Sequence, residues 1–269
     1  MIIFLLVFIL FGFLFYDSNT RIVVDDYTLF YDNLPDSFNG YRIAQLTDIH
    51  AAEFGGDQSK LLEAVKKARA NIIVITGDLI DSADDIDIVQ PRIKSLPALA
   101  PVYYVTGNHE WASGALRELI EMLESYGVTV LQNNYVNLTV GDESLVLAGV
   151  DDPNGPKDMK TPEELVSDIR GREGDPFIVL LEHRNNFLDR FAALGIDLVM
   201  SGHAHGGVIR LPFTDGLIGP SLEWFPDFTS GIYTEDDTNM VVSSGIGNRT
   251  GIPRFLNNPQ VLVAVLRTS

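Results

Sequence analysis

The sequence Ile72-Ile73-Val74-Ile75-Thr76-Gly77-Asp78 is the most informative part of this chain of 269 residues. Its four consecutive apolar residues are typical of a strand that is buried on both faces, as strands of parallel sheets are. The run ends directly in the polar residues Thr76 and Asp78, with a glycine between them. Before it, at residues 59–70, apolar residues repeat at helical spacing. A helix followed by a buried strand predicts an α/β domain.

The same alternation of helices and strands recurs along the chain, without an internal repeat or a Ser/Gly-rich linker. We therefore expect residues 21–269 to form one α/β domain of mixed sheet content. One strand is expected over residues 22–24 and 27–31, and further strands at residues 41–47, 72–75, 102–105, 129–131, 135–140, 144–150, 177–181, 196–200, 240–243 and 261–266. Helices are expected at residues 59–70, 86–94, 161–171 (ended by Gly171) and 186–193, and after Ser113, as the cap of a helix that stops at Gly127.

The N-terminal segment has a different composition. Residues 1–16, MIIFLLVFILFGFLFY, contain no charged side chain. As a helix they would span about 24 Å, slightly less than the hydrocarbon core of a bilayer. The segment lacks the basic start and small-residue cleavage site of a signal peptide, and it shows no amphipathic face. Residues 1–20 are therefore predicted to be a single transmembrane anchor in the cell membrane. The acidic residues that follow it favour an extracytoplasmic body.

Composition excludes several classes of protein. The chain has 37 Asp and Glu against 19 Lys and Arg, a net charge of −18, which argues against long nucleic acid and against broad electrostatic binding to anionic lipid. With 46% hydrophobic residues it is not a disordered chain. It has no Cys, so any transition metal must be bound by nitrogen and oxygen atoms.

Polar residues follow five of the predicted buried strands, and all five His of the chain lie in these loops. Each loop alone would be an ordinary turn, but the carboxyl ends of strands in α/β sheets meet at one ligand crevice. Imidazole and carboxylate groups together suit Mn, Fe, Zn, Co or Ni. Since eight candidates exceed the needs of one ion, we expect two divalent ions that share a carboxylate. The candidates are Asp48, His50, Asp78, Asn108, His109, His183, His203 and His205.

In this order, the motifs resemble the calcineurin-like metallophosphoesterase family, and in particular a membrane-associated bacterial branch with enzymes similar to UDP-2,3-diacylglucosamine pyrophosphatases. The resemblance covers the chain from about residue 34 to the C-terminus and implies a four-layer α/β/β/α sandwich. The motifs are Asp48-x-His50, Gly77-Asp78, Gly107-Asn108-His109-Glu110, His183 and Gly202-His203-x-His205, supported by Gly206-Gly207 and residues 244–247.

The family pattern also implies a role for each residue. One metal ion would bind Asp48, His50, Asp78 and His205, and the second Asp78, Asn108, His183 and His203, so that Asp78 bridges them. A water between the ions would become hydroxide near neutral pH and attack phosphorus in line.

His109 would face the phosphate and the leaving group, where it stabilises charge or protonates the leaving oxygen. Glu110 is expected to orient His109, and the glycines before Asp78, Asn108 and His203 are expected to turn the backbone sharply off each strand.

The chain departs from its close relatives at two places. Val208 stands where they often carry Gln, and residues 182–185, Glu-His-Arg-Asn, stand where they often carry Ser-His-x-Pro. Neither change removes a ligand. Arg184 is expected either to contact a phosphate of the substrate or to pair with Glu182.

The prediction of the substrate is based on residues 211–233, which are rich in aromatic and aliphatic side chains. On a chain held at a bilayer, this loop indicates an amphiphilic phosphoester, such as a phospholipid, a lipid-linked sugar or a polyprenyl phosphate, contacted by Trp224 and Phe225. The alternative is that Phe213, Leu217, Trp224 and Phe225 only pack the loop. A phosphodiesterase or phosphatase for a soluble nucleotide or sugar phosphate stays open, as does a non-catalytic metal-binding scaffold, against which the complete ligand set argues. No protein partner is inferred.

Overall fold

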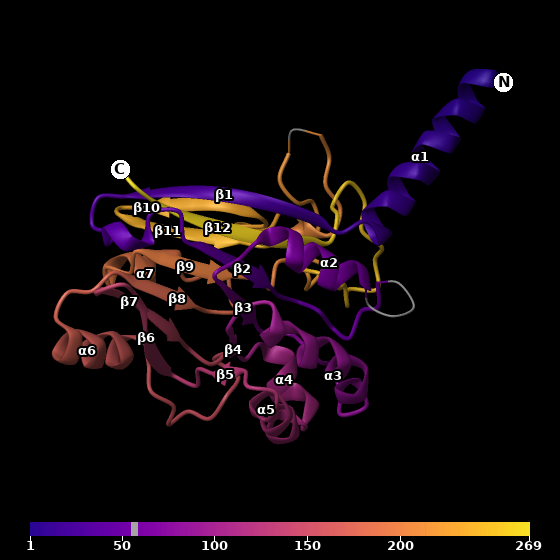
Figure 1. Ribbon diagram of the computed structural model, residues 1–269. Coiled ribbons are helices and arrows are strands. Elements are labelled where there is room, and N and C mark those ends of the chain that lie inside the picture. Colours follow the sequence, from indigo (N-terminus) through magenta and orange to yellow (C-terminus); the bar gives the residue numbers. More distant parts are fainter. Residues whose placement is uncertain (55–58, 213) are drawn as a thin grey trace.

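The body of the protein is built on two six-stranded sheets packed face to face (Figure 1), in a computed structural model that describes residues 1–54, 59–212 and 214–269. The first sheet contains β1 (Val23–Tyr31), β2 (Arg42–Leu46), β3 (Ile72–Thr76), β4 (Val102–Val105), β5 (Thr129–Val130) and β12 (Gln260–Thr268). The second contains β6 (Asn134–Val140), β7 (Glu143–Gly149), β8 (Ile178–Leu181), β9 (Leu198–Ser201), β10 (Gly231–Glu235) and β11 (Thr238–Val242). Their orders are β1-β12-β2-β3-β4-β5 and β10-β11-β9-β8-β7-β6.

Parallel pairing dominates the centre of both sheets. Strands β2 to β5 run parallel to one another, as do β7, β8, β9 and β11. Antiparallel pairs form where β12 meets β2, where β6 meets β7 and where β10 meets β11. Because the central strands of both sheets run parallel, their carboxyl ends gather at one edge of the sandwich.

Helices cover the outer face of each sheet. Beside the first sheet lie α2 (Ser59–Ala68), α3 (Asp85–Ser95) and α5 (Leu116–Ser125), and beside the second lie α6 (Pro162–Glu173) and α7 (Leu188–Ala193). Strand β3 shows why the central strands are apolar throughout. Ile73 and Ile75 pack against the helices, whereas Ile72 and Val74 pack against the other sheet. The predicted four-layer α/β/β/α sandwich is confirmed.

The strand expected between residues 22 and 31 is β1, Val23–Tyr31. Other local expectations need correction. Ser113 does not cap α5; it ends an unpredicted short helix, α4 (Asn108–Ser113), and Ala115 precedes α5. Gly171 does not stop α6, which continues to Glu173. Single turns of 3-10 helix lie at Asp36–Phe38, Leu96–Ala98 and His205–Gly207.

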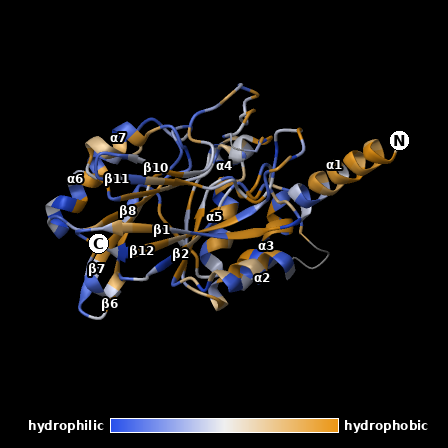
Figure 2. Cartoon of the chain, turned by 90° about the horizontal axis from the view of Figure 1, so that it is seen from above, coloured by the Kyte–Doolittle hydropathy of each residue, from blue (hydrophilic) through white to orange (hydrophobic). Residues whose placement is uncertain are grey.

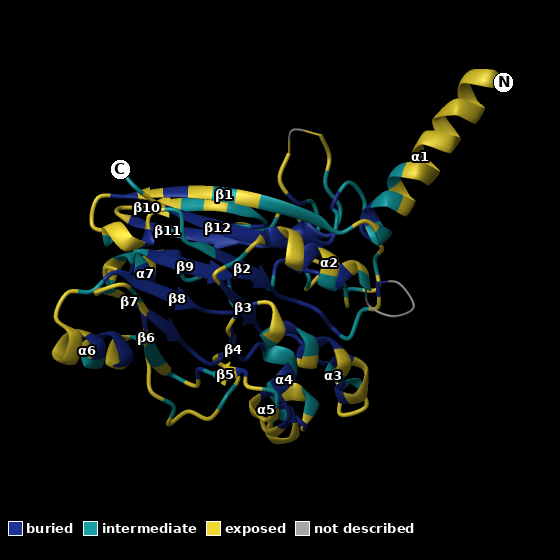
Figure 3. Ribbon diagram, in the orientation of Figure 1, coloured by how far each residue is buried: buried dark blue, intermediate teal, exposed yellow. Residues whose placement is uncertain are grey.

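The N-terminal helix α1 (Ile2–Thr20) projects away from the body and is almost entirely exposed (Figures 2 and 3). It is long and apolar enough to cross a membrane by length and composition. Its last turn is attached to the body, because the Asn19 side chain donates to the Arg254 carbonyl at 2.8 Å and accepts from the Arg254 amide at 3.1 Å. The division into an anchor at residues 1–20 and a domain at 21–269 stays a prediction.

Candidate metal centre

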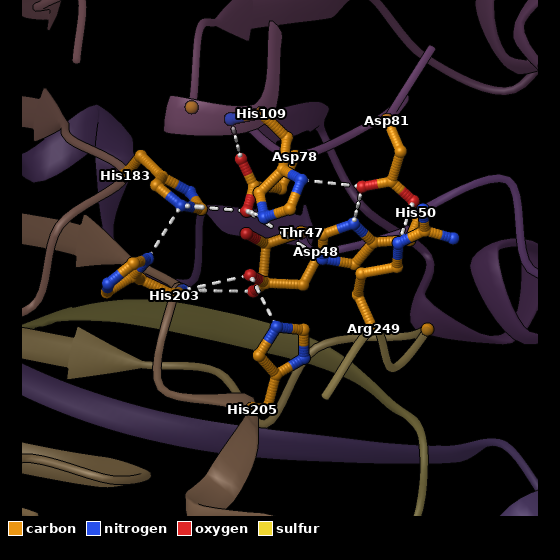
Figure 4. Close-up of polar contacts among 12 residues, drawn as sticks. Thr47, Asp48, His50, Asp78, Asp81, His109, His183, His203, His205 and Arg249 are labelled. Atoms are coloured by element: carbon orange, nitrogen blue, oxygen red, sulfur yellow. Dashed lines mark hydrogen bonds and ion pairs between the residues drawn. The ribbon is translucent and has the colours of Figure 1, made fainter. Parts of the chain in front are cut away.

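The loops after β2, β3, β4, β8 and β9 carry the predicted site residues to one edge of the sandwich (Figure 4). Three groups of three side chains each offer ligand atoms that lie within 4.8 Å of one another, and two of them consist of predicted ligands alone. The first group is Asp48, His50 and His205, and the second is Asp78, His183 and His203. Asn108 and His109 begin helix α4 beside them.

Asp78 lies between the two groups. Its Oδ2 atom is 3.3 Å from Nε2 of His183, in the second group, and 3.7 Å from Nε2 of His50, in the first. Its Oδ1 atom accepts a hydrogen bond from the backbone amide of His109 at 3.0 Å. The carboxylate is therefore held by the backbone on one side and faces both histidine groups on the other.

The backbone at the site is strained in a way that fits a functional site. Five of the predicted ligands have left-handed φ angles: Asp48 at 51°, His50 at 46°, Asp78 at 51°, His203 at 68° and His205 at 49°. For residues with a side chain such conformations cost about 1–3 kcal/mol each and cluster where geometry serves function.

The glycines before the predicted ligands mostly allow neighbouring carboxylates to lie close to the backbone. Gly77 does take the expected turn, with φ +82°, but Gly107 has an ordinary φ of −108°. A Cβ atom at Gly107 would lie 2.3 Å from Oδ1 of Asp78, and one at Gly202 would lie 2.5 Å from Oδ2 of Asp48. These two glycines let the carboxylates lie directly against neighbouring backbone.

Three buried polar atoms of the predicted ligands lack a hydrogen-bond partner within the described part of the chain: Nε2 of His50, Nδ1 of His205 and Oδ1 of Asn108. A buried polar atom without a partner is costly, and its presence calls for an explanation such as an ion. A divalent cation would accept lone pairs from all three kinds of group. The donor set thus fits a divalent metal.

The buried carboxylates of the site favour a positive charge beside them. Burial opposes ionisation of Asp78, yet His183 and His50 beside it hold the pKa of its carboxyl below the ordinary value. Although burial disfavours a charged His183, the adjacent carboxylate of Asp78 raises the pKa of this imidazole to about 10. Burial and the nearby His183 and Arg184 lower the pKa of His203 to about 3, so His203 is a neutral imidazole, the form that binds metals.

Asp81 is a site residue that the sequence analysis missed. Its Oδ1 atom lies 2.6 Å from Nδ1 of His109 and 2.8 Å from Nδ1 of His50, and its Oδ2 atom lies 3.3 Å from Nε of Arg249. The hydrogen bond to Asp81 is the main reason why the pKa of His109 is raised. Its position three residues after Asp78, in the same loop, was the available signal.

Glu110 does not have the role expected of it. Its buried carboxylate accepts hydrogen bonds from the backbone amides of Gly107, Asp78 and Leu79 at 2.6, 3.0 and 2.5 Å. It therefore fixes the loop that carries Asp78, while Asp81 makes the contact to the His109 ring.

Arg184 also has a different partner from the one expected. Its guanidinium makes two hydrogen bonds to Asp152, at 2.6 and 3.2 Å, and only its backbone amide donates to Glu182. Asp152 is completely buried. Its Nη1 atom makes a long contact of 3.5 Å to Nε2 of His203, so the cation is fixed at the border of the metal centre.

A pocket of about 520 Å³ opens beside Arg184 and His203, and Trp224 and Phe225 form part of its wall. Their exposed fractions are 69% and 70%. These two side chains are thus largely solvent-facing. Phe213 lies outside the described residues.

Comparison with known proteins identifies the family. A family model described as calcineurin-like phosphoesterase matches residues 41–207, which include every predicted ligand. The chain belongs to the calcineurin-like phosphoesterase family. As a member it is a metal-dependent phosphoesterase.

Relatives of this phosphoesterase span bacteria and animals. It is 28% identical over 267 residues to the uncharacterized metallophosphoesterase YkuE of Bacillus subtilis, covering 96% of this chain and 90% of that protein. It is 27% identical to a transmembrane protein with metallophosphoesterase domain of Danio rerio, covering 88% of this chain but 55% of that protein. Among solved structures, the NAD nucleotidase NadN of Haemophilus influenzae matches 76% of this chain and 45% of its own, at a TM-score of 0.50 and 17% identity, a likeness of fold alone.

Proposed function

We propose that this phosphoesterase uses two divalent metal ions to hydrolyse a membrane-derived or amphiphilic phosphoester. The observation that carries the proposal is the position of Asp78, whose carboxylate lies within 3.7 Å of histidines from both ligand groups. One ion would be held by Asp48, His50, Asp78 and His205. The other would be held by Asp78, Asn108, His183 and His203.

Proton transfer and substrate binding would be carried out by the chain's own residues. Two bound ions supply an activated water and neutralise charge on the phosphoryl oxygens. His109, one-third exposed and held by Asp81, presents Nε2 toward the centre and is placed to protonate the leaving oxygen. Arg184, fixed by Asp152, offers Nη1 to a substrate oxygen, and its planar fork suits phosphate.

The amphiphilic substrate is supported by the aromatic wall of the pocket and by helix α1. Trp224 and Phe225 expose apolar surface next to the phosphate-binding side of the centre. Helix α1 would hold this pocket near a bilayer as a single-pass anchor. We place the body outside the cytoplasm because the segment after the anchor is acidic. The relative from Danio rerio is likewise named a transmembrane protein.

The test compares two diesters with the same p-nitrophenyl leaving group, one with a long alkyl chain and bis-p-nitrophenyl phosphate. Trp224→Ala/Phe225→Ala should lower kcat/KM for the alkyl diester about tenfold and leave the aryl diester within about twofold, because only the alkyl chain needs the apolar wall. Leu211→Ala is the matched control, since Leu211 is an exposed apolar residue of the same loop that does not line the pocket. Equal losses on both diesters would favour a soluble substrate and contradict the proposal.

A further inference from the structure

We propose that the groove between α1 and α2 binds the headgroup of an anionic phospholipid in the membrane that holds α1. This inference rests on the proposed membrane anchoring, but it concerns a surface separate from the metal centre. The groove has a volume of about 380 Å³. It is lined by Phe13, Tyr16 and Arg21 from the α1 segment and by Lys60, Glu63 and Lys67 from α2.

The groove lies at the level where α1 would leave the hydrocarbon. Tyr16 ends the uncharged run of residues 1–16, and Asp17 is the first charged residue after it. Tyr is enriched at this depth because its ring is apolar and its hydroxyl polar. Figure 2 shows the change from the apolar shaft of α1 to polar residues at its base, next to the body. A groove at this depth faces lipid headgroups.

Two free ammonium groups provide the chemistry that recognises a phosphate. Lys60 and Lys67 are exposed, and neither forms an ion pair within the described residues. Asp17 is already neutralised by Arg21, with hydrogen bonds of 2.6 and 2.7 Å. This leaves Glu63 as the remaining carboxylate of the groove against two lysines. On a chain with a net charge of −18, the groove is locally cationic.

The groove keeps its shape because the base of α1 is fixed to the body. Asn258 donates to the Asp17 carbonyl at 2.8 Å, and Asn19 is bound to the Arg254 backbone. The face of α2 that carries Lys60 and Lys67 is therefore held toward the bilayer. Phe13, one turn farther into the helix, offers an apolar surface to the first part of an acyl chain, while the lysines meet the phosphate.

The test is native mass spectrometry of the full chain in detergent, titrated with phosphatidylglycerol or with phosphatidylcholine of the same acyl chains. Wild type should bind phosphatidylglycerol about fivefold more tightly or better, since each basic residue near an anionic headgroup contributes about this factor. Lys60→Gln/Lys67→Gln should abolish the preference. Lys66→Gln is the matched control, because Lys66 lies on the same helix, is exposed and does not line the groove.

Three results would overturn the inference: equal binding of both lipids by wild type, a preference that survives in the double variant, or binding of inorganic phosphate alone with the same dependence on the two lysines. Carbonate extraction of membranes tests the anchor separately. A wild-type chain that resists extraction but shows no lipid preference refutes the groove alone. Hydrolysis of bis-p-nitrophenyl phosphate should be the same in all these variants, because Lys60 and Lys67 lie outside the metal centre.

Discussion

Nδ1 of His109 and Oδ1 of Asp81 lie 2.6 Å apart. This contact fixes the imidazole so that its other nitrogen, Nε2, lies 3.8 Å from Oδ2 of Asp78. A proton donor for the leaving group must be held in this way, because catalysis by proton transfer depends on position before it depends on pKa. Asp81 is therefore a positioning residue for His109.

Asp81→Asn should lower kcat for bis-p-nitrophenyl phosphate about 10- to 100-fold, the usual effect of losing a partner that orients a site residue. If Asp81 acts through His109, adding Asp81→Asn to His109→Ala should cause little further loss. Because Asp81 also contacts His50, the metal content of each variant should be measured by elemental analysis. Full additivity of the two losses, at unchanged metal content, would refute the positioning role.

The pair of Arg184 and Asp152 leads to a prediction about substrate binding. If Arg184 binds the substrate as proposed, Asp152→Asn should raise KM by about tenfold with kcat nearly unchanged, as Arg184→Gln should, because one variant lacks the carboxylate that fixes the cation and the other lacks the cation itself. The double variant should resemble either single variant. Asp168→Asn breaks an exposed ion pair with Lys160 and serves as the control that leaves KM unchanged. A fall in kcat without a rise in KM would contradict this account.

Two glycines should respond in opposite ways to the same substitution. Gly107→Ala places a methyl group against Asp78, so it should destabilise the fold by about 1–3 kcal/mol and impair metal binding. Gly171→Ala adds a methyl group within α6 that would meet no described atom outside its own helix within 4 Å, so it should stabilise by about 0.5–1 kcal/mol. Urea denaturation measures both free energies of unfolding. A neutral Gly107→Ala would show that the carboxylate does not need this close approach.

The ion pair between Glu163 of α6 and Arg190 of α7 should give a pH-dependent contribution to stability. The hydrogen bond that the Glu163 carboxylate accepts from Arg190 lowers the pKa of Glu163 to about 2, from an ordinary 4.5. Because the folded-state pKa is the lower one, the contribution is present above pH 4.5 and is lost as the pH falls toward 2. Both side chains are over one-third exposed, so Glu163→Gln should cost only about 0.2–1 kcal/mol at pH 7. Thermal unfolding of variant and wild type should converge near pH 2; a constant difference would contradict the assignment.

The sequence predicted an α/β domain and the gathering of the metal-site residues because both depend on local patterns, whereas the four-layer sandwich followed from the family resemblance. An apolar run predicts a buried strand such as β3. A polar residue directly after the run, such as Asp78, must then lie at the carboxyl edge of the sheet. Partners fixed by the tertiary structure gave no comparable signal. Asp152 lies 32 positions from Arg184 in sequence, and their pairing depends on how β7 and β8 adjoin.

Local capping rules failed for a similar reason. Ser113 has the chemistry of a helix cap, but Glu110 binds the preceding loop and makes residues 108–113 a helix of their own. The exposure of Trp224 could not be predicted either, since an aromatic residue in a loop is as compatible with packing as with a pocket wall.

The most direct test of the central claim is hydrolysis of bis-p-nitrophenyl phosphate with Mn²⁺ by wild type, Asp78→Ala and His109→Ala, combined with elemental analysis. We predict that wild type is active with two ions per chain. Asp78→Ala should lose both ions and at least about a thousandfold in rate, and His109→Ala should keep its ions but lose about 10²- to 10⁴-fold. No hydrolysis by wild type with any divalent metal, or full activity of Asp78→Ala, would contradict the account.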